Sequence, residues 1–151
     1  MHLILWRHAE AEAGIDDMRR ELTPHGRSQA TRAAAWLRRY LPEDARILVS
    51  PAVRTQQTAD ALQLPYETVP EIEPGADTQD VLEAANWPTG GGAVVVVGHQ
   101  PTLGRVAAFL MTGNPLQWSV RKSGIWWLSS RERDDETQIV LRSVINPEFL
   151  E

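Results

Sequence analysis

The sequence predicts a three-layer α/β/α sandwich with a mostly parallel central sheet, and two observations carry this prediction. Three apolar runs, Leu3–Trp6, Ile47–Val49 and Ala93–Val97, have the length and β-branched content of strands, and helical patterns separate them. Strands that alternate with helices favour a parallel sheet. The run AVVVV at 93–97 does not alternate with polar residues, which is typical of a parallel strand covered by helices on both faces.

The first two helices are predicted from their capping residues and their apolar spacing. Thr23 is a good N-cap residue and Pro24 suits a first helical turn, so a helix is expected to begin near residue 24. The apolar positions that follow recur at intervals of three and four residues: Ala30, Ala33, Ala34, Leu37 and Leu41. The second helix is expected to begin with Ser50 as its cap and Pro51 in its first turn, and to run to about Gln63.

The remaining elements complete the order β-α-β-α-(β)-α-β-α-β-β. After the second helix we expect a short extended piece near Glu67–Val69 and a weaker helix over Thr78–Asn86. The third apolar run leads into a helix from Pro101 to Gly113. The segments GIWWLSS and QIVLRSVI, with the polar RERDDET between them, predict a β-hairpin, in which Trp126 and Trp127 point to opposite faces.

Length and composition limit the number of domains and the partners. A chain of 151 residues without internal repeats or a long linker suits a single domain, expected over residues 1–151. The net charge of −5 offers no attraction to nucleic acid or to an anionic membrane, so any anion site must be local. The absence of cysteine excludes disulfides, thiolate nucleophiles and cysteine metal sites. Because no leader pattern and no apolar run near the roughly 20 residues that span a bilayer are present, we expect a cytoplasmic location.

Basic and imidazole side chains follow each of the three main strands. Arg7 and His8 come after the first strand, Ser50 to Arg54 after the second, and His99 after the third. Because ligands bind outside the carboxyl ends of the strands in an open parallel sheet, these segments are expected to meet at one edge. Two guanidiniums, two imidazoles and helix N-termini at one edge predict a site for a tetrahedral dianion such as phosphate.

The nucleophile that this site suggests is an imidazole, since the chain has neither a cysteine nor a Gly-rich phosphate-binding loop. Neutral His8 would attack phosphorus with one ring nitrogen while the other donates to a backbone carbonyl. Arg7, Arg54 and His99 would hold the phosphate oxygens and stabilise the charge of the transition state. The neighbouring cations are expected to keep His8 unprotonated.

Four segments carry a family resemblance. RHAEAE at 7–12, LTPHGRSQA at 22–30, SPAVRTQQTA at 50–59 and VGHQP at 97–101 resemble, in order and spacing, the motifs of the histidine phosphatase (phosphoglycerate mutase-like) superfamily. The short length and VPEIEPGAD at 69–77 look most like its SixA-type protein phosphohistidine phosphatases. The resemblance covers nearly the whole chain.

The resemblance implies a set of roles. It implies a phosphohistidine enzyme intermediate on His8, a phosphate pocket from Arg7, Arg54 and His99, and neither a metal nor another cofactor. It also implies a carboxylic acid between the second and third main strands, for which Glu71 stands at the usual position and Glu73 is the weaker candidate. The family usually has glycine after the Arg-His pair, whereas this chain has Ala9. We expect the Ala9 amide to remain available to phosphate, so that the methyl group tunes activity without abolishing it.

The substrate prediction follows from the same comparison. The 27 residues from Leu64 to Gly90 leave no room for the long insertion that covers the pocket in phosphoglycerate mutases and in many small-molecule phosphatases. An open pocket, together with imidazole as an easy leaving group, favours phosphohistidine on a protein such as a phosphotransfer domain or phosphorelay carrier. The alternatives are a small-molecule phosphomonoesterase of the same superfamily and a non-catalytic phosphate-binding module. The sequence leaves the oligomeric state open.

Other polar residues have simpler interpretations. His2 and His25 invite a zinc site, but neither an HxH nor an HxxxH spacing supports it, and the arginines near His8 and His99 would repel a cation. His25 is expected to lie exposed in the first turn of its helix and His2 at the edge of the first strand. The Arg19–Arg20 pair is interpreted as solvated charge, with substrate contact from the loop after the first strand as the alternative.

Overall fold

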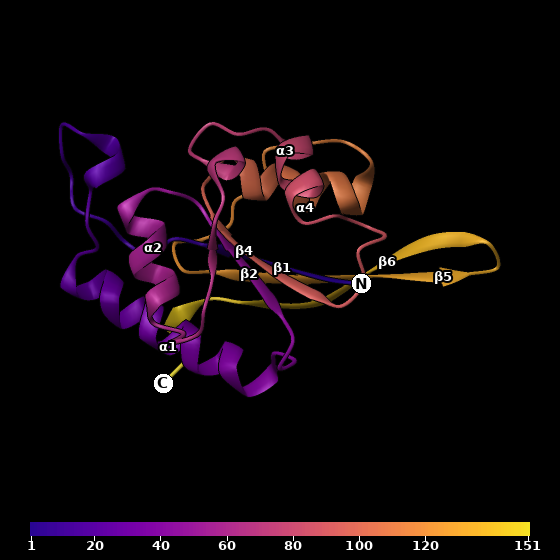
Figure 1. Ribbon diagram of the computed structural model, residues 1–151, viewed down its shortest axis with the longest axis horizontal. Coiled ribbons are helices and arrows are strands. Elements are labelled where there is room, and N and C mark those ends of the chain that lie inside the picture. The colour runs from indigo at the N-terminus through magenta and orange to yellow at the C-terminus, as the bar shows by residue number, and fades with distance from the viewer.

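Six strands form one sheet in the order β3-β2-β4-β1-β5-β6, in a computed structural model that describes residues 1–151 (Figure 1). The first four of these run parallel to one another: β3 (Glu67–Thr68), β2 (Arg46–Val49), β4 (Ala93–Gly98) and β1 (His2–Arg7). The hairpin of β5 (Ile125–Arg133) and β6 (Glu136–Ile145) continues the sheet in antiparallel fashion. The mixed, mostly parallel sheet that the sequence predicts is therefore confirmed.

Two helices cover each face of the sheet. α1 (Pro24–Tyr40) and α2 (Val53–Asp60) lie on one face, and α3 (Thr78–Ala84) and α4 (Thr102–Thr112) lie on the other (Figure 1). The three layers of the predicted sandwich follow from this arrangement. None of the helices combines the length and the apolar character that a bilayer crossing requires.

The central strands divide their side chains between two cores. In β1, Leu3 and Leu5 pack with α3 and α4, whereas Ile4 and Trp6 pack with α1 and α2. All six residues of β4 are buried, and its valines divide between the same two cores. A strand buried on both faces needs apolar residues at every position, and this is the physical reason for the run AVVVV.

The helix boundaries confirm most of the predicted capping. The Thr23 hydroxyl accepts the Gly26 N–H at 2.9 Å at the start of α1. Helix α4 begins one residue after Pro101 and ends one residue before Gly113, whose φ of 86° closes the helix in the left-handed conformation. Helix α3 ends at Ala84, short of its predicted end at Asn86.

The predicted start of the second helix is wrong. α2 begins at Val53, with Ala52 in the N-cap position, and it ends at Asp60. The Ser50 N–H donates to the Val97 carbonyl at 3.1 Å, which keeps Ser50 in the extended path of the sheet. Ser50 therefore directly follows β2 in an extended path, and its hydroxyl accepts the Ala52 N–H at 3.3 Å instead of capping α2.

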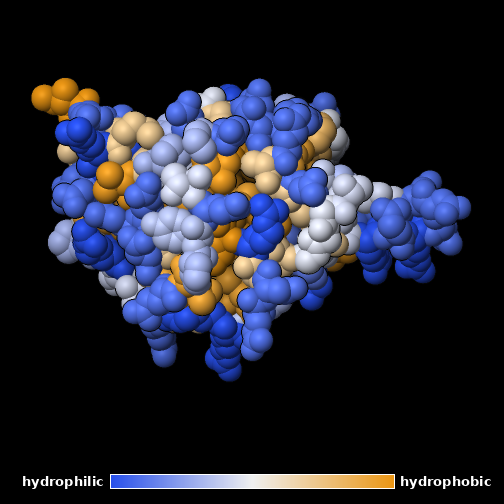
Figure 2. All heavy atoms as spheres, in the orientation of Figure 1, coloured by the Kyte–Doolittle hydropathy of each residue, from blue (hydrophilic) through white to orange (hydrophobic).

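The β5–β6 hairpin is longer than predicted. Its strands extend into the polar segment, and only Asp134 and Asp135 form the turn, with φ values of 54° and 64° that suit a two-residue hairpin turn. The far end of the hairpin projects from the body and carries hydrophilic residues on its surface (Figure 2). Nearer the body, Trp126 packs beside Trp118 and Trp127 packs beside Trp36, with ring centroids 5.8 and 6.1 Å apart, so the two tryptophans do face opposite sides.

Candidate active site

The carboxyl ends of β1, β2 and β4 bring two imidazoles together. His8 follows β1, and its N–H donates to the carbonyl of Gly98 at the end of β4 at 3.1 Å. The ring centroids of His8 and His99 lie 5.4 Å apart. Both residues are buried, with exposed fractions of 8% and 3%. The predicted convergence of these two residues at one sheet edge is confirmed.

The His8 ring is held in one tautomer. Its Nδ1 lies 2.7 Å from the carbonyl oxygen of Ala9. Because a carbonyl oxygen only accepts hydrogen bonds, Nδ1 of the neutral ring carries the proton and donates, and Nε2 keeps its lone pair. The pKa of His8 is lowered to about 4, first by burial and then by the positive charges of Arg54 and Arg7, against the opposing effect of the Ala9 carbonyl. The expected neutral ring is confirmed, with burial as the main cause in place of the neighbouring cations.

His99 is paired with Ser50. The His99 Nε2 lies 2.7 Å from the Ser50 Oγ, and Nδ1 of the same ring is buried without a partner in the protein. The pKa of His99 is lowered to about 3, mainly by burial and also by the charges of His8 and Arg54. If the Ser50 hydroxyl donates to Nε2, the ring proton lies on Nδ1, which is then an unpaired donor within the site.

Two arginines complete the cluster. Arg54 is 4% exposed, and its Nη1 and Nη2 donate to the backbone carbonyl and the carboxylate of Asp17 at 2.7 and 3.1 Å. Arg7 donates from Nη1 to the Val120 carbonyl at 3.0 Å. The Nε atoms of both arginines are buried and have no partner in the protein. Together with His99 Nδ1 they account for three of the four such side-chain atoms in the chain, and buried donors of this kind are rare unless a polar ligand binds them.

Asp17 is a residue that the sequence analysis missed. It lies in the 3-10 turn Asp17–Arg19, within the loop between β1 and α1. Hydrogen bonds from Arg20 and Arg54 hold the pKa of its carboxylate below the usual range, against the opposing effect of burial. Arg20 also donates to the Glu12 carbonyl at 2.7 Å, and Arg19 pairs with Asp16 at 3.4 Å. Both arginines of the predicted pair therefore bind within their own loop.

The backbone amide of Ala9 does not point freely into the site. Ala9 is fully buried, and its N–H donates to the Thr58 Oγ1 at 3.0 Å. That hydroxyl in turn donates to the Arg54 carbonyl at 2.7 Å. The expectation that the Ala9 amide is available to phosphate is wrong, because a hydroxyl one helical turn after Arg54 already accepts its hydrogen bond. Thr58 lies in the segment SPAVRTQQTA, four residues after Arg54, so the two residues share one face of α2.

The first turn of α1 fixes the segment that follows His8. The Thr23 hydroxyl donates to the Glu10 carboxylate at 2.7 Å while it accepts the Gly26 N–H. A Cβ atom at Gly26 would lie 2.0 Å from the Glu10 carbonyl oxygen, so only glycine permits this approach. The Glu10 N–H donates to the Gln29 side chain at 3.0 Å. The residues of LTPHGRSQA thus position the chain after the nucleophile candidate.

The two candidate acids lie on the surface. Glu71 is exposed on the 3-10 turn Pro70–Ile72 and lines a groove of about 260 Å³ that also contains Arg46 and Asp80. None of the residues that line this groove belongs to the His8–His99 cluster. Glu73 is exposed directly after the same turn. The role of either residue as an acid stays a prediction.

The histidines outside the cluster have other partners or surroundings. His2, at the opposite end of β1, accepts the Trp127 Nε1–H at 3.0 Å, and His25 is exposed in the first turn of α1. No group of three or more histidine, aspartate or glutamate side chains is arranged to hold a metal ion. What the cluster offers chemically is a neutral imidazole with a free Nε2 beside the unpaired Nε–H donors of Arg7 and Arg54 and the buried ring of His99, which suits the binding and transfer of a tetrahedral oxyanion.

Comparisons with known proteins agree with this chemistry. The model of the histidine phosphatase superfamily (branch 1) matches residues 3–81. The chain is 34% identical over 123 residues to the phosphohistidine phosphatase SixA of Escherichia coli, a match that covers 75% of this chain and 76% of that protein. It is 34% identical over 127 residues to the phosphohistidine phosphatase SixA homolog of Haemophilus influenzae, with 73% and 77% covered. A solved structure of the protein histidine phosphatase SixA complexed with tungstate aligns over 97% of both chains, with a TM-score of 0.76 and 27% identity.

Proposed function

The chain belongs to branch 1 of the histidine phosphatase superfamily and is a phosphatase, and from this premise we propose that it removes phosphate from phosphohistidine on a protein. The observation that carries the chemistry is the neutral His8 ring, with Nδ1 held by the Ala9 carbonyl and Nε2 free beside Arg7, Arg54 and His99. The relatives named phosphohistidine phosphatase SixA support the substrate class. The related structure that holds tungstate, a tetrahedral oxyanion, supports phosphate as the transferred group.

In the proposed first step, the lone pair of His8 Nε2 attacks phosphorus. The P–N bond to the substrate imidazole breaks, its electron pair goes to the substrate nitrogen, and that nitrogen takes up a proton from solvent water. The proton on His8 Nδ1 stays in its hydrogen bond to the Ala9 carbonyl, which stabilises the positive charge that develops on the ring. In the second step, water attacks phosphorus, the P–Nε2 bond breaks, and inorganic phosphate leaves with neutral His8 restored.

The cations hold the phosphoryl oxygens in this proposal. Arg7 and Arg54 contribute their unpaired Nε–H groups and His99 contributes Nδ1–H, which are the buried donors without partners in the protein. Donors fixed before the reaction stabilise the charge of a phosphoryl-transfer transition state without reorganising. Asp17 and Ser50 act through Arg54 and His99 as positioning residues.

The leaving group decides how much acid catalysis the reaction needs. Imidazole leaves with a conjugate-acid pKa near 6.5, far below that of an alkoxide. A phosphohistidine substrate therefore requires little help from Glu71, the acid that we assign, or from Glu73, the second candidate. This fits the exposed position of Glu71 outside the cluster.

The fold between α2 and β4 supports a substrate on a protein surface. This part of the chain forms β3, the turn Pro70–Ile72 and α3, and α3 packs against α4. It supplies no long insertion of the kind that would enclose a small molecule. Closing an active site around a substrate expels water from it, and an open site gives a small substrate little of that enclosure.

The test compares phosphate release from three substrates: a phosphohistidine-bearing phosphotransfer domain, a sugar phosphate and p-nitrophenyl phosphate. We expect the highest kcat/KM with the phosphorylated domain and loss of all turnover in His8→Ala. The matched control is His2→Ala, which removes a histidine from the opposite end of β1 and should retain activity.

Other results would identify the alternatives. Saturable turnover of small phosphates alone would contradict the proposed substrate and indicate a small-molecule phosphomonoesterase. Phosphate binding without turnover of any substrate would indicate a non-catalytic phosphate-binding module.

A further inference from the structure

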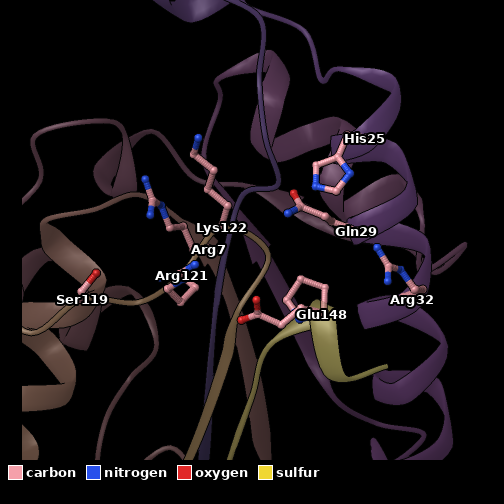
Figure 3. Close-up of a pocket in the computed structure, with 9 residues that line it drawn as sticks. Arg7, His25, Gln29, Arg32, Ser119, Arg121, Lys122 and Glu148 are labelled. Atoms are coloured by element: carbon pink, nitrogen blue, oxygen red, sulfur yellow. The ribbon is translucent and has the colours of Figure 1, made fainter. Parts of the chain in front are cut away.

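A basic cleft of about 510 Å³ lies beside the candidate active site and shares Arg7 with it (Figure 3). His25 and Arg32 of α1 lie on one side of this cleft, and Arg121 and Lys122 of the loop before β5 lie on the other. Eight of its nine lining residues are polar or charged, and the ninth is Pro147. The proposed function uses only Arg7 among these residues.

The charge of the cleft is opposite to that of the whole protein. The chain carries a net charge of −5, yet the cleft brings Arg7, Arg32, Arg121 and Lys122 together with a single carboxylate, Glu148. The protein contains four ion pairs, between Arg19 and Asp16, Arg20 and Asp17, Arg46 and Glu67, and Arg54 and Asp17. None involves a cation of the cleft. Several unpaired cations in an acidic protein indicate a surface that meets an anionic partner.

The loop that carries Arg121 and Lys122 is fixed to the nucleophile segment. The Val120 carbonyl accepts from Arg7, and the Ser123 N–H donates to the His8 carbonyl at 3.1 Å. The Ser123 hydroxyl accepts the Trp6 Nε1–H at 3.2 Å. The charge of Arg121 contributes, after burial, to a lowered pKa of Arg7, which places the two guanidiniums within electrostatic reach. The two exposed cations therefore stand at a fixed position beside the phosphate pocket.

The composition of the cleft favours a protein surface as its occupant. Pockets for small molecules are lined mostly by apolar and aromatic side chains that bury the ligand. This cleft is lined almost entirely by polar and charged side chains, with Pro147 as its one apolar residue, and its exposed cations Arg121 and Lys122 extend from a loop. Charged side chains at such a rim steer an acidic partner and select it against neutral ones.

We infer that the basic cleft binds carboxylate side chains of the protein substrate, next to the phosphohistidine that enters the His8 pocket. This inference rests on the proposed function and adds to it a substrate class: proteins whose phosphorylated histidine is flanked by aspartate or glutamate. The geometry that carries it is that the cleft and the pocket share Arg7. Arg121 and Lys122 also stand between Val120 and Ser123, the two residues whose backbone groups bond to Arg7 and His8.

The test uses two synthetic phosphohistidine peptides that differ only in their flanking residues, four glutamates in one and four glutamines in the other. For the unmodified enzyme we expect kcat/KM to be about tenfold higher with the glutamate peptide. Each exposed ion pair contributes little binding energy, but several cations of the cleft would bind the glutamates at once. The double substitution Arg121→Ala and Lys122→Ala should reduce this preference to less than about twofold. Its kcat/KM for free phosphohistidine should stay within about threefold of the unmodified enzyme.

The matched control removes the same charge elsewhere. Arg131→Ala with Arg133→Ala takes two exposed cations from the far end of the hairpin and should keep the tenfold preference. High salt should weaken the preference of the unmodified enzyme, because exposed charges are screened. Equal kcat/KM on both peptides in the unmodified enzyme would overturn the inference, and so would a preference that survives in the Arg121/Lys122 variant.

Failure of the proposed function is distinguishable from failure of this inference. If neither phosphohistidine peptide is hydrolysed, the proposed function fails, and the unphosphorylated glutamate peptide is then tested as a competitive inhibitor of p-nitrophenyl phosphate hydrolysis. Inhibition of the unmodified enzyme, lost in the Arg121/Lys122 variant and kept in the hairpin control, would support the cleft as a carboxylate site. Absence of inhibition would overturn it.

Discussion

The burial of a neutral His8 predicts how stability depends on pH. The pKa of this ring is about 4 in the native protein against 6.5 for the ordinary side chain. Between these values the unfolded chain binds more protons than the native protein, so the free energy of unfolding falls as pH falls from 6.5 toward 4. From about pH 7.5 to about pH 5, the His8 contribution to this fall amounts to about 2 kcal/mol.

The measurement is urea unfolding at both pH values, followed by the fluorescence of the six tryptophans, for the unmodified protein and for His8→Asn. The asparagine amide keeps a donor near the position of Nδ1, and it does not titrate. His99, with a native pKa of about 3, is neutral in both folded proteins over this range, so its own contribution cancels in the comparison. The asparagine variant should therefore lose about 2 kcal/mol less stability on acidification. A loss of equal size in both proteins would refute the burial of a neutral His8.

Further substitutions test the supports of the site. Thr58→Val leaves the buried N–H of Ala9 without an acceptor and should lower the free energy of unfolding by about 1–3 kcal/mol in urea titrations. Thr58→Ser keeps the hydroxyl acceptor and should retain most of the stability of the unmodified protein, so equal stability of the two variants would contradict this hydrogen bond. Gly26→Ala places a Cβ atom 2.0 Å from the Glu10 carbonyl oxygen. It should therefore cost about 1–3 kcal/mol and reduce kcat, and an unchanged Tm would exclude the close approach. Glu71→Gln should lower kcat for an alkyl phosphate ester by about 100-fold and that for phosphohistidine far less, whereas equal losses would count against the assigned acid.

The convergence at the sheet edge was predictable because it depends only on the direction of the strands. Arg7–His8, Arg54 and His99 follow β1, β2 and β4, and parallel strands bring their carboxyl ends together whatever the details of packing. The sequence analysis also predicted that one ring nitrogen of His8 donates to a backbone carbonyl, and the acceptor is the carbonyl of the next residue, Ala9.

The partners of the site residues depend on tertiary packing and were not predictable. The Asp17–Arg54 pair requires a 3-10 turn in the loop between β1 and α1, and nothing in the local pattern of that loop specifies where its carboxylates point. The hydrogen bond from Ala9 to Thr58 requires α2 to lie against the segment after β1. Ser50 has the composition of a helix cap, but its backbone continues the sheet and its hydroxyl meets His99.

The central claim is that His8 Nε2 is the atom that accepts the phosphoryl group. The most direct measurement is rapid quenching in alkali after mixing the protein with phosphoramidate, followed by mass spectrometry of the digested chain. The account predicts a phosphoryl group on His8 Nε2 that survives alkali and is lost in acid, and none in His8→Ala. A phosphoryl group on His99 or on another residue, or undiminished turnover in His8→Ala, would contradict it.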